Sequence, residues 1–212
     1  MSPAAGFQDV SPTILADILG RSQVMDIGIR PLWAPMTRVA GPAFTVRCAP
    51  GDNLMLHAAI YRAEPGSILV VEAGDVDYAL AGGNVCAIAK RRGIAALVTD
   101  GVVRDLAEVR DLGFPVFARG VMPAPGAKLA ASPLNGRVQC GGAAVEAGDI
   151  VVADEEGIAV VPGAGSQDVL RDALAQQERE ERQSLDAWEE THRALVDRLL
   201  AEKGYAGFKL SS

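Results

Sequence analysis

The pattern of apolar and polar positions predicts helices alternating with short strands over the first half of the chain. Ser11 is suited to cap a helix, Pro12 fits its first turn and Gly20 ends it. Proline and glycine are frequent at 28–42, which predicts a loop. Apolar and polar residues then alternate at 43–48, as expected of a strand.

The same alternation of elements continues along the chain. Asp52 is expected to cap a helix at 53–63, just after a turn at Pro50. The apolar run at 67–72 predicts a second strand, and 114–118 predicts a later one. Strands that alternate with helices indicate an α/β domain.

Between those two strands, the stretch 83–108 is predicted to form a helix, a buried strand, a turn and a second helix. Apolar residues at helical spacing support a helix at 84–92, which Gly93 would close. The apolar run at 94–98 is typical of a short buried strand.

Residues 136–162 lack any helical pattern, and glycine turns there separate short β-rich runs. Helix and strand units followed by a β-rich segment predict a layered α/β domain that is not a regular doubly wound sheet. We assign this layered α/β domain to 1–165.

The chain changes character after Pro162. Residues 166–203 contain no glycine, and 176–183 carry no apolar side chain. A single helix of about 35 residues would be about 50 Å long, against a radius of gyration of about 17 Å for a compact chain of this size. The segment is either a solvated helix or an arm that crosses onto a neighbouring subunit. We assign 166–212 to a C-terminal helical extension for oligomerisation.

Composition and charge exclude several classes of protein. The 212 residues are 49% hydrophobic and 22% charged, which indicates a globular chain large enough for a full core. The net charge of −7 argues against a nucleic-acid surface. No apolar run approaches the roughly 20 residues that span a bilayer, and residues 1–10 lack the features of a signal peptide. We therefore expect neither nucleic acid nor membrane as a partner.

Cysteine usage indicates a reducing compartment. Cys48, Cys86 and Cys140 are far apart and odd in number, which favours free thiols in the cytoplasm. Each is expected to be a small core residue.

Several common catalytic motifs are missing. Gly163 and Gly165 lack the third glycine of a dinucleotide-binding loop, and the chain has no G-x-S-x-G elbow. With His57 and His192 as the only histidines, one chain cannot assemble a histidine-based zinc site, and His57 is expected to pack in its helix. A Schiff base requires a desolvated lysine, whereas Lys90 stands beside two arginines and is expected to be exposed.

Metal chemistry with oxygen ligands remains. Gly82 and Gly83 precede a predicted helix, so its free backbone N–H groups can approach an anion closely. Arg104 stands before Asp105 and Glu108, which are three apart at the start of the next helix and face the same side. These groups could hold an anionic substrate together with Mg²⁺ or Mn²⁺. They are equally compatible with an ordinary helix start, where acidic residues favour the helix dipole.

The spacing of these residues resembles that of a known family. Gly83, twenty residues, Arg104-Asp105, two residues and Glu108 resemble a signature of the class II 4-hydroxy-4-methyl-2-oxoglutarate/4-carboxy-4-hydroxy-2-oxoadipate aldolases. These aldolases share a fold with the regulator of ribonuclease E activity A. Further segments resemble the family in order and spacing: Ala49–Asn53, Pro65-Gly66 with Leu69–Val71, Arg110-Asp111 with Gly113-Phe114, Cys140–Gly142 and Gly148–Asp154.

The resemblance covers roughly 40–161, with weaker agreement along the C-terminal helix. It implies an α/β fold of the ribonuclease-E-regulator-like type: a layered αββα or ββα sandwich with a long C-terminal helix. It also implies assembly into homotrimers or homohexamers.

The resemblance implies a role for each site residue. Asp105 would be a protein ligand of a divalent metal ion, with Glu108 as the second carboxylate. Arg104 would bind the carboxylate and keto oxygen of a pyruvate-like group, assisted by the backbone N–H groups of Asn84 and Val85.

Two further positions follow from the same comparison. Many of these aldolases carry aspartate where this chain has Gly83, and a variant signature moves that carboxylate to Glu108. Glu180 falls where the family places a carboxylate that reaches the neighbouring subunit's site.

The function implied is a Mg²⁺- or Mn²⁺-dependent lyase of aromatic catabolism. It would cleave a 4-hydroxy-2-oxo acid to pyruvate and a second oxo acid, and would decarboxylate oxaloacetate through the same enolate. The alternative from another class is a non-catalytic regulator that binds a ribonuclease or a helicase. The pair Asp105 and Glu108 favours the enzyme, because the regulator branch typically lacks these carboxylates.

Overall fold

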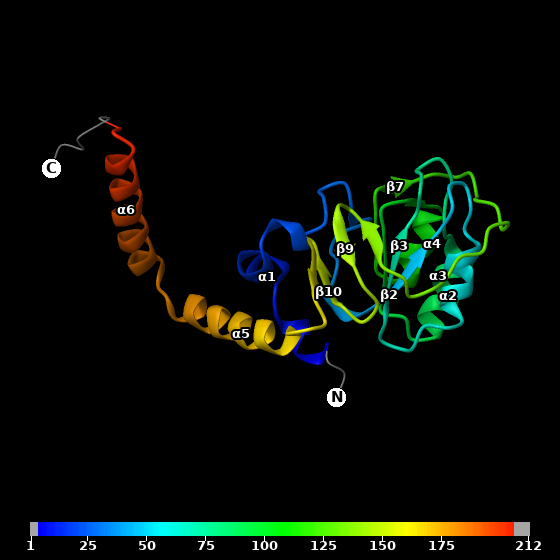
Figure 1. The fold of residues 1–212 in the computed structure, drawn as a ribbon, viewed down its shortest axis with the longest axis horizontal. Helices are drawn as coiled ribbons and strands as arrows, with labels where there is room; N and C mark the ends of the chain where they lie inside the picture. Colours follow the sequence, from blue (N-terminus) through cyan, green and yellow to red (C-terminus); the bar gives the residue numbers. More distant parts are fainter. Residues whose placement is uncertain (1–3, 206–212) are drawn as a thin grey trace. The chain divides into compact units, whose positions relative to one another are not determined.

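The computed structural model describes residues 4–205. Its largest sheet has seven strands in the order β1-β6-β4-β3-β2-β10-β11 (Figure 1). The four central strands β6, β4, β3 and β2 run parallel, whereas β1 and β10 pair antiparallel with their neighbours. The strands of this sheet are β1 (Arg30–Pro31), β2 (Val39–Arg47), β3 (Ile68–Glu72), β4 (Ala96–Thr99), β6 (Val116–Ala118), β10 (Ile150–Asp154) and β11 (Gly157–Val161).

Both faces of the parallel strands are buried. On β3, Leu69 and Val71 belong to one apolar cluster, whereas Ile68 and Val70 belong to another on the opposite face. This alternation follows from the two-residue period of a strand, and it explains why the sequence shows a continuous apolar run instead of an alternating one. The parallel strands therefore form an inner layer.

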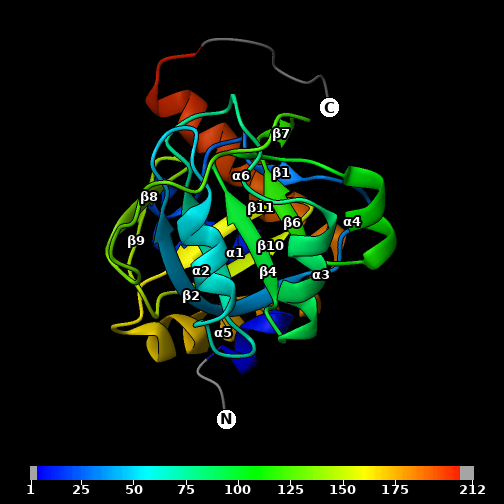
Figure 2. The same cartoon turned by 90° about the vertical axis from the view of Figure 1, so that its right-hand side faces the viewer.

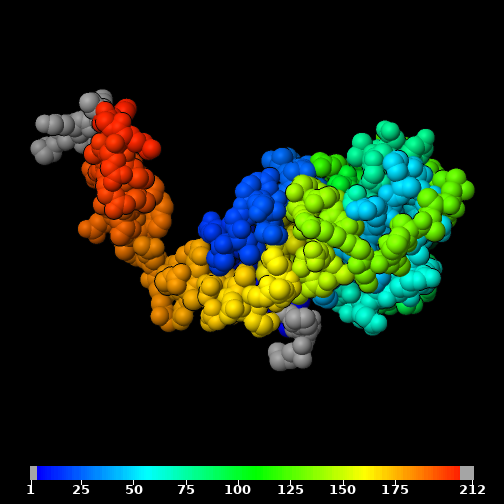
Figure 3. Space-filling view, viewed as in Figure 1, coloured from blue at the N-terminus to red at the C-terminus, as the bar shows by residue number. Residues whose placement is uncertain are grey.

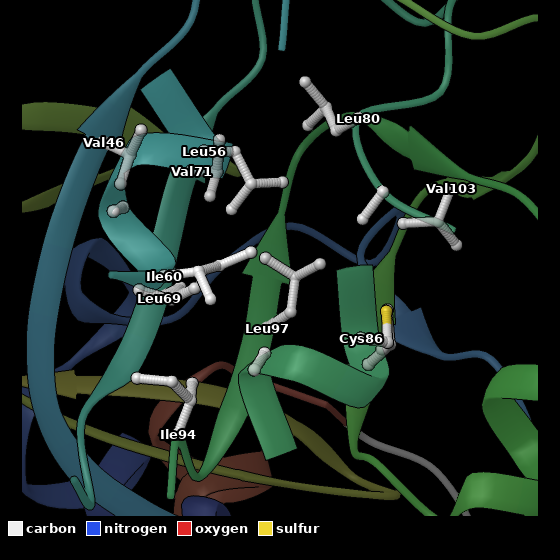
Figure 4. Close-up of a cluster of buried hydrophobic side chains, with 14 of the residues drawn as sticks. Val46, Leu56, Ile60, Leu69, Val71, Leu80, Cys86, Ile94, Leu97 and Val103 are labelled. Atoms are coloured by element: carbon white, nitrogen blue, oxygen red, sulfur yellow. The ribbon is translucent and has the colours of Figure 1, made fainter. Parts of the chain in front are cut away.

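Three helices cover the first face of these strands: α2 (Leu54–Ile60), α3 (Gly83–Arg91) and α4 (Leu106–Leu112). Figure 2 shows α2 and α3 lying across the sheet. Leu56 and Ile60 of α2 pack against Leu69 and Leu97 of the sheet in the cluster drawn in Figure 4. This cluster holds the helices against the sheet, and the sites described below lie at the ends of these helices.

The opposite face packs on a second β layer, into which the same seven-stranded sheet continues: residues 43–47 of β2 pair with β3, whereas residues 39–42 pair with β10. The hairpin of β8 (Val138–Cys140) and β9 (Ala143–Val145), together with β10 and β11, closes a core with the inward residues of the parallel strands. The outer face of β10 and β11 is covered by α1 (Pro12–Leu19) and the 3-10 helix η1 (Ala5–Asp9). In the space-filling view these N-terminal residues lie against the β10–β11 segment (Figure 3).

The order of layers is helix, sheet, sheet, helix, which confirms the αββα arrangement expected from the sequence. The predicted first helix is also confirmed. Ser11 caps α1 by accepting a hydrogen bond from the N–H of Ile14, and Gly20 is its C-cap. The layered part of the chain also contains η2 (Arg21–Gln23) and a small parallel sheet of β5 (Val102–Val103) and β7 (Gly120–Val121).

The loop predicted at 28–42 is wrong in part. It contains β1, and β2 begins at Val39 instead of residue 43. Gly41 lies inside β2 because a Cβ there would collide with the carbonyl oxygen of Gly66, so close packing requires glycine at this position. The first half of β2 pairs with β10, a partner more than a hundred residues away that no local pattern reveals.

The predicted role of Asp52 is also corrected. Helix α2 is shorter than 53–63, and its N-cap is Asn53, which makes no side-chain capping bond. The Asp52 carboxylate accepts from the N–H of Leu54, but it also accepts from the N–H groups of Leu129 and Ala130. Asp52 thus joins a helix start to a distant loop.

The single long C-terminal helix is corrected to two helices, α5 (Ser166–Arg182) and α6 (Leu185–Glu202). Ser184 separates them because its side chain caps α6, accepting from the N–H of Ala187 at 3.2 Å. Residues 206–212 of the predicted extension lie outside the described residues.

The chain divides into two compact units, Met1–Ala173 and Leu174–Ser212. Ala173 is fully buried and Leu170 packs against the N-terminal cluster, so α5 begins as part of the layered unit. In the second unit α6 has no buried residue. The oligomerisation role and the division at 165 stay predictions.

Candidate active site

The N-terminus of α3 is built from two buried glycines. Gly82 is the N-cap in extended backbone, and Gly83 is the first helical residue. The first intrahelical bond of α3 runs from Cys86 N–H to Gly82. Within residues 4–205, the N–H groups of Asn84 and Val85 have no hydrogen-bond acceptor, as expected at a helix start. These two N–H groups are available to an anion.

A short turn between β5 and α4 brings a guanidinium and a carboxylate to this helix start. Arg104 is tied to the glycine loop by a 2.9 Å hydrogen bond from its N–H to the carbonyl of Ala81. The Asp105 carboxylate accepts from Gly83 N–H at 3.0 Å and lies 3.5 Å from the Arg104 Nε. Both side chains remain about two-fifths exposed, so a ligand can reach them.

The backbone of Asp105 corrects one detail of the sequence prediction. Asp105 does not share a helical face with Glu108; it precedes α4 as its N-cap, with φ 57° and ψ 41°. Asp105 and Asn135 are the non-glycine residues with positive φ in the part of the chain that the structure describes. Such a conformation at a polar turn is typical of a functional site.

The two carboxylates converge on the two glycines. A Cβ on Gly82 would collide with Asp105 Oδ2 and would lie 3.0 Å from the Arg104 Nε. A Cβ on Gly83 would collide with Glu108 Oε2. The absence of side chains at both glycines is therefore what allows Asp105 and Glu108 to approach the start of α3.

The apolar core holds this arrangement in place. Cys86 of α3 and Val103, which precedes Arg104, are buried in the same cluster (Figure 4). Burial, with a smaller effect of the Asp105 charge, raises the pKa of the Cys86 thiol to about 12. Cys86 is thus a neutral packing residue, as predicted for all three cysteines, which are free and buried.

Three polar residues that the sequence did not indicate as site residues are Asn53, His57 and Lys128, of which the first two contact the backbone just before the glycines, at Ala79 and Leu80. Asn53 donates to the carbonyl of Ala79 and is buried, with its own side-chain oxygen unpartnered in the described chain. The backbone of Leu80 and the charge of Lys128 both act on the His57 imidazole. Burial first, and then the charge of Lys128, lower the pKa of His57, because both disfavour the charged imidazole.

The donors suit a hard divalent cation. Asp105 and Glu108 offer carboxylate oxygens at one helix start, and no group of three or more His, Cys, Asp or Glu side chains converges anywhere in residues 4–205. Mg²⁺ is commonly held by one or two carboxylates, with water and substrate oxygens completing its shell. Two carboxylates beside a free anion site therefore fit such an ion.

Glu180 lies in the second unit, on α5, where its carboxylate accepts from the Gln176 side chain at 2.9 Å. Its predicted place at a neighbouring subunit's site stays a prediction.

A family model described as RraA-like, Aldolase/RraA, matches residues 9–160. The chain belongs to the Aldolase/RraA family. A relative from Halalkalibacterium halodurans named "Putative 4-hydroxy-4-methyl-2-oxoglutarate aldolase" is 35% identical over 94% of this chain and 91% of its own length. The family resemblance expected from the Gly83, Arg104-Asp105 and Glu108 spacing is thus confirmed.

Solved structures of Aldolase/RraA proteins confirm the fold. Streptomyces coelicolor RraAS2, described as an unusual member of the RNase ES inhibitor RraA family, matches with a TM-score of 0.73 and 30% identity, over 84% of this chain and 94% of its own. The RNA-processing inhibitor RraA from Thermus thermophilis matches with a TM-score of 0.66 and 26% identity, over 73% and 93% of the two chains. No helix in residues 4–205 is both long and apolar enough to cross a membrane.

Proposed function

We propose that the chain is a divalent-metal-dependent aldolase that cleaves a 4-hydroxy-2-oxo acid to pyruvate and a second oxo acid. The observation that carries this proposal is the convergence of Arg104, Asp105 and Glu108 on the glycine start of α3. The family relatives named as aldolases support the same activity. 4-Hydroxy-4-methyl-2-oxoglutarate and 4-carboxy-4-hydroxy-2-oxoadipate are the substrates proposed.

Substrate binding uses the pyruvyl half of the molecule. The Arg104 guanidinium pairs with the carboxylate and keto oxygen of the 2-oxo acid through its planar fork of donors. The free N–H groups of Asn84 and Val85 donate to the same oxygens. In this binding mode we expect the bond between C3 and C4 to face the Glu108 carboxylate.

Cleavage then requires a proton and an electron pair to move. The C4 hydroxyl gives its proton through a water to the Glu108 carboxylate, the C4–O bond becomes the carbonyl of the second oxo acid, and the C3–C4 bond breaks with its electrons staying on the pyruvyl half as an enolate. Arg104 stabilises the enolate charge, and a proton returned to C3 completes pyruvate. Asp105 and Glu108 would hold a divalent ion, which would supply Lewis-acid stabilisation of the same charge. Oxaloacetate loses carbon dioxide through this enolate, so decarboxylation is expected as a side activity.

The proposal extends to assembly and location. Exposed apolar residues on α6 support a homotrimer or homohexamer in which Glu180 completes a neighbouring site, because such residues commonly mark an interaction surface. They are Leu185, Trp188, Leu195, Val196, Leu199 and Leu200. Three free, buried thiols support a reducing compartment such as the cytoplasm.

A second candidate is a non-catalytic regulator of RNA processing. It is favoured by the fold shared with proteins described as RNase ES and RNA-processing inhibitors. The carboxylates of Asp105 and Glu108 at the glycine start of α3 favour the enzyme, because a surface inhibitor has no need of them.

The test is pyruvate release from oxaloacetate and from 4-hydroxy-4-methyl-2-oxoglutarate, with Mg²⁺ or with EDTA. We expect turnover with Mg²⁺ and a loss of at least about a hundredfold with EDTA, since the ion stabilises the enolate. Unchanged turnover in EDTA, or a pyruvate adduct trapped on a lysine by borohydride, would refute the metal mechanism. No turnover on either substrate, combined with inhibition of a ribonuclease, would favour the regulator.

A further inference from the structure

A cleft of about 430 Å³ lies at the far end of α3 from the candidate active site. It is lined by residues that follow α2 and by residues at the C-terminal end of α3, including Tyr61, Arg62, Arg91 and Arg92. Helix α3 begins at Gly83 in the candidate site and ends at this cleft, about 12 Å away along its axis. The volume is within the range of small-molecule sites.

The cleft gathers positive charge in a chain of net charge −7. None of its three arginines forms an ion pair with any residue in 4–205, and Glu64, which also lines the cleft, does not pair with them. Lys90 adjoins the cluster along the chain and donates to the carbonyl of Leu112. Unopposed like charges raise the local potential and attract an anion.

Two of the guanidinium groups are held in place before any ligand binds. Arg92 donates from Nε to the Ile60 carbonyl at 2.8 Å and from Nη2 to the Tyr61 carbonyl at 3.3 Å. Arg62 donates from Nη1 to the Ala58 carbonyl at 2.9 Å. Each keeps further N–H donors that these carbonyls do not use, since a guanidinium carries five.

The chain segments beside the cleft are anchored in the core. Ile60 ends α2 and Ile94 follows the end of α3, and both are buried in the cluster of Figure 4. Arg91 is exposed, and its side chain makes no hydrogen bond or ion pair within the described residues. Fixed donors on anchored segments, with one free arginine beside them, lower the ordering cost of binding.

We propose that this cleft binds a small anion that carries a diphosphate group. Guanidinium forks match phosphate oxygens, and three of them without a carboxylate partner suit a ligand with two or more negative charges. The proposal is independent of the aldolase activity, because no residue of the cleft belongs to the candidate active site.

A diphosphate group is found in two kinds of ligand, the free pyrophosphate ion and a nucleotide. The Tyr61 ring is 57% exposed at the cleft, with the Arg92 guanidinium 5.5 Å from its centroid. An aromatic ring beside bound phosphates offers a stacking surface for a base. Pyrophosphate and ADP therefore distinguish the two kinds, since only ADP can use this ring.

The experiment is calorimetric titration of the full chain with pyrophosphate and with ADP, at about 0.15 M salt so that exposed charges are screened, and with EDTA present. Arg91→Ala should weaken pyrophosphate binding by about tenfold or more, the effect of losing a charge-assisted hydrogen bond. The matched control is Arg137→Ala, which removes an exposed arginine that does not line the cleft and should change the Kd by less than about twofold.

The outcomes separate the models. If ADP binds more tightly than pyrophosphate and Tyr61→Leu abolishes that difference, the ligand is a nucleotide. If the two probes bind equally, the ligand is the free ion. Either result supports the proposal. It is overturned if pyrophosphate does not bind, if citrate binds as tightly, or if both arginine variants weaken binding equally. Binding lost in Arg104→Ala but kept in Arg91→Ala also overturns it, because the anion would then lie in the candidate active site.

Discussion

Asp105 has an uncommon backbone conformation, and its side chain makes an uncommon hydrogen bond for an N-cap residue. An aspartate at an N-cap normally accepts from the first N–H groups of its own helix, a bond worth about 1 kcal/mol. Here the left-handed conformation turns the carboxylate away from α4, which has no side-chain cap, and toward Gly83 of α3. Helix α4 loses the stability that a capping bond would add, as expected where a carboxylate is positioned for binding instead.

Gly82 provides the cleanest single-residue probe of this geometry. Its φ of −142° and ψ of −169° suit any residue, so Gly82→Ala adds no backbone strain. The new Cβ would displace the Asp105 and Arg104 side chains, and we expect pyruvate release to fall by about tenfold or more, because small misplacements are costly in catalysis. Thermal unfolding should change little, since both displaced groups are flexible and partly exposed.

The matched control for that variant is Gly136→Ala. No heavy atom lies within 4 Å of a Cβ built there, so activity and stability should both be retained. Full activity in Gly82→Ala would show that the close approach of Asp105 has no catalytic role.

At the scale of elements, Asp52 couples the start of α2 to the loop that carries Lys128. Burial alone raises the pKa of the Asp52 carboxyl, but hydrogen bonds from the N–H groups of Leu129, Leu54 and Ala130 hold it below its ordinary value. Asp52→Ala leaves these donors without an acceptor and should lower the free energy of unfolding by about 2–3 kcal/mol. Asp111→Ala, at a carboxylate 81% exposed, is the control and should change it by less than about 0.5 kcal/mol.

The same carboxylate gives a pH dependence with a definite sign. Because its folded pKa is depressed, its contribution is present above the unfolded value, near 3.8, and is lost as pH falls through the folded pKa. The stability difference between wild type and Asp52→Ala, followed by urea unfolding, should therefore shrink below pH 3.8. A difference that stays constant or grows in acid would assign the effect to packing instead of charge.

The elements also show what the sequence could predict. Gly83, Arg104 and Asp105 were identifiable because their chemistry is local to two helix starts, and the spacing carries the family signature. Asn53 and Lys128 were not, because they come from separate segments that meet only through long-range pairing, such as the bridge between Asp52 and Ala127. No local pattern encodes such a meeting.

The errors in the predicted elements have two causes: long-range packing that no local pattern encodes, and a helix cap that the prediction overlooks. The start of β2 was missed since Gly41 resembles a turn residue until the packing against Gly66 is known. The break between α5 and α6 did have a local signal, because Ser184 is a good N-cap inside an otherwise helical segment.

At the scale of the whole molecule, the layers explain why the candidate site lies where it does. Helices α3 and α4 cover one face of the parallel strands, and their N-termini meet beside β5. The site so formed is open, with Arg104 and Asp105 partly exposed. An open site of this kind is compatible with completion by another subunit, as proposed for Glu180.

Mixing two inactive chains tests that shared site. Asp105→Asn and Glu180→Ala should each be inactive, and a refolded equimolar mixture should regain activity in about a quarter of its sites, where an intact Asp105 meets an intact Glu180 in a cyclic oligomer. No recovery on mixing, or a fully active monomer by light scattering, would remove the shared-site model.

The most direct test of the metal-dependent site is the initial rate of pyruvate release from oxaloacetate as Mg²⁺ is titrated into metal-free wild type and into Asp105→Asn. Asparagine tolerates the left-handed backbone and can still accept from Gly83 N–H, so the fold should be preserved while the charge is lost. We predict saturable activation of the wild type and, in the variant, a rate at least about a hundredfold lower at every Mg²⁺ concentration. Equal Mg²⁺ activation of the two proteins would contradict the assignment of the metal to Asp105.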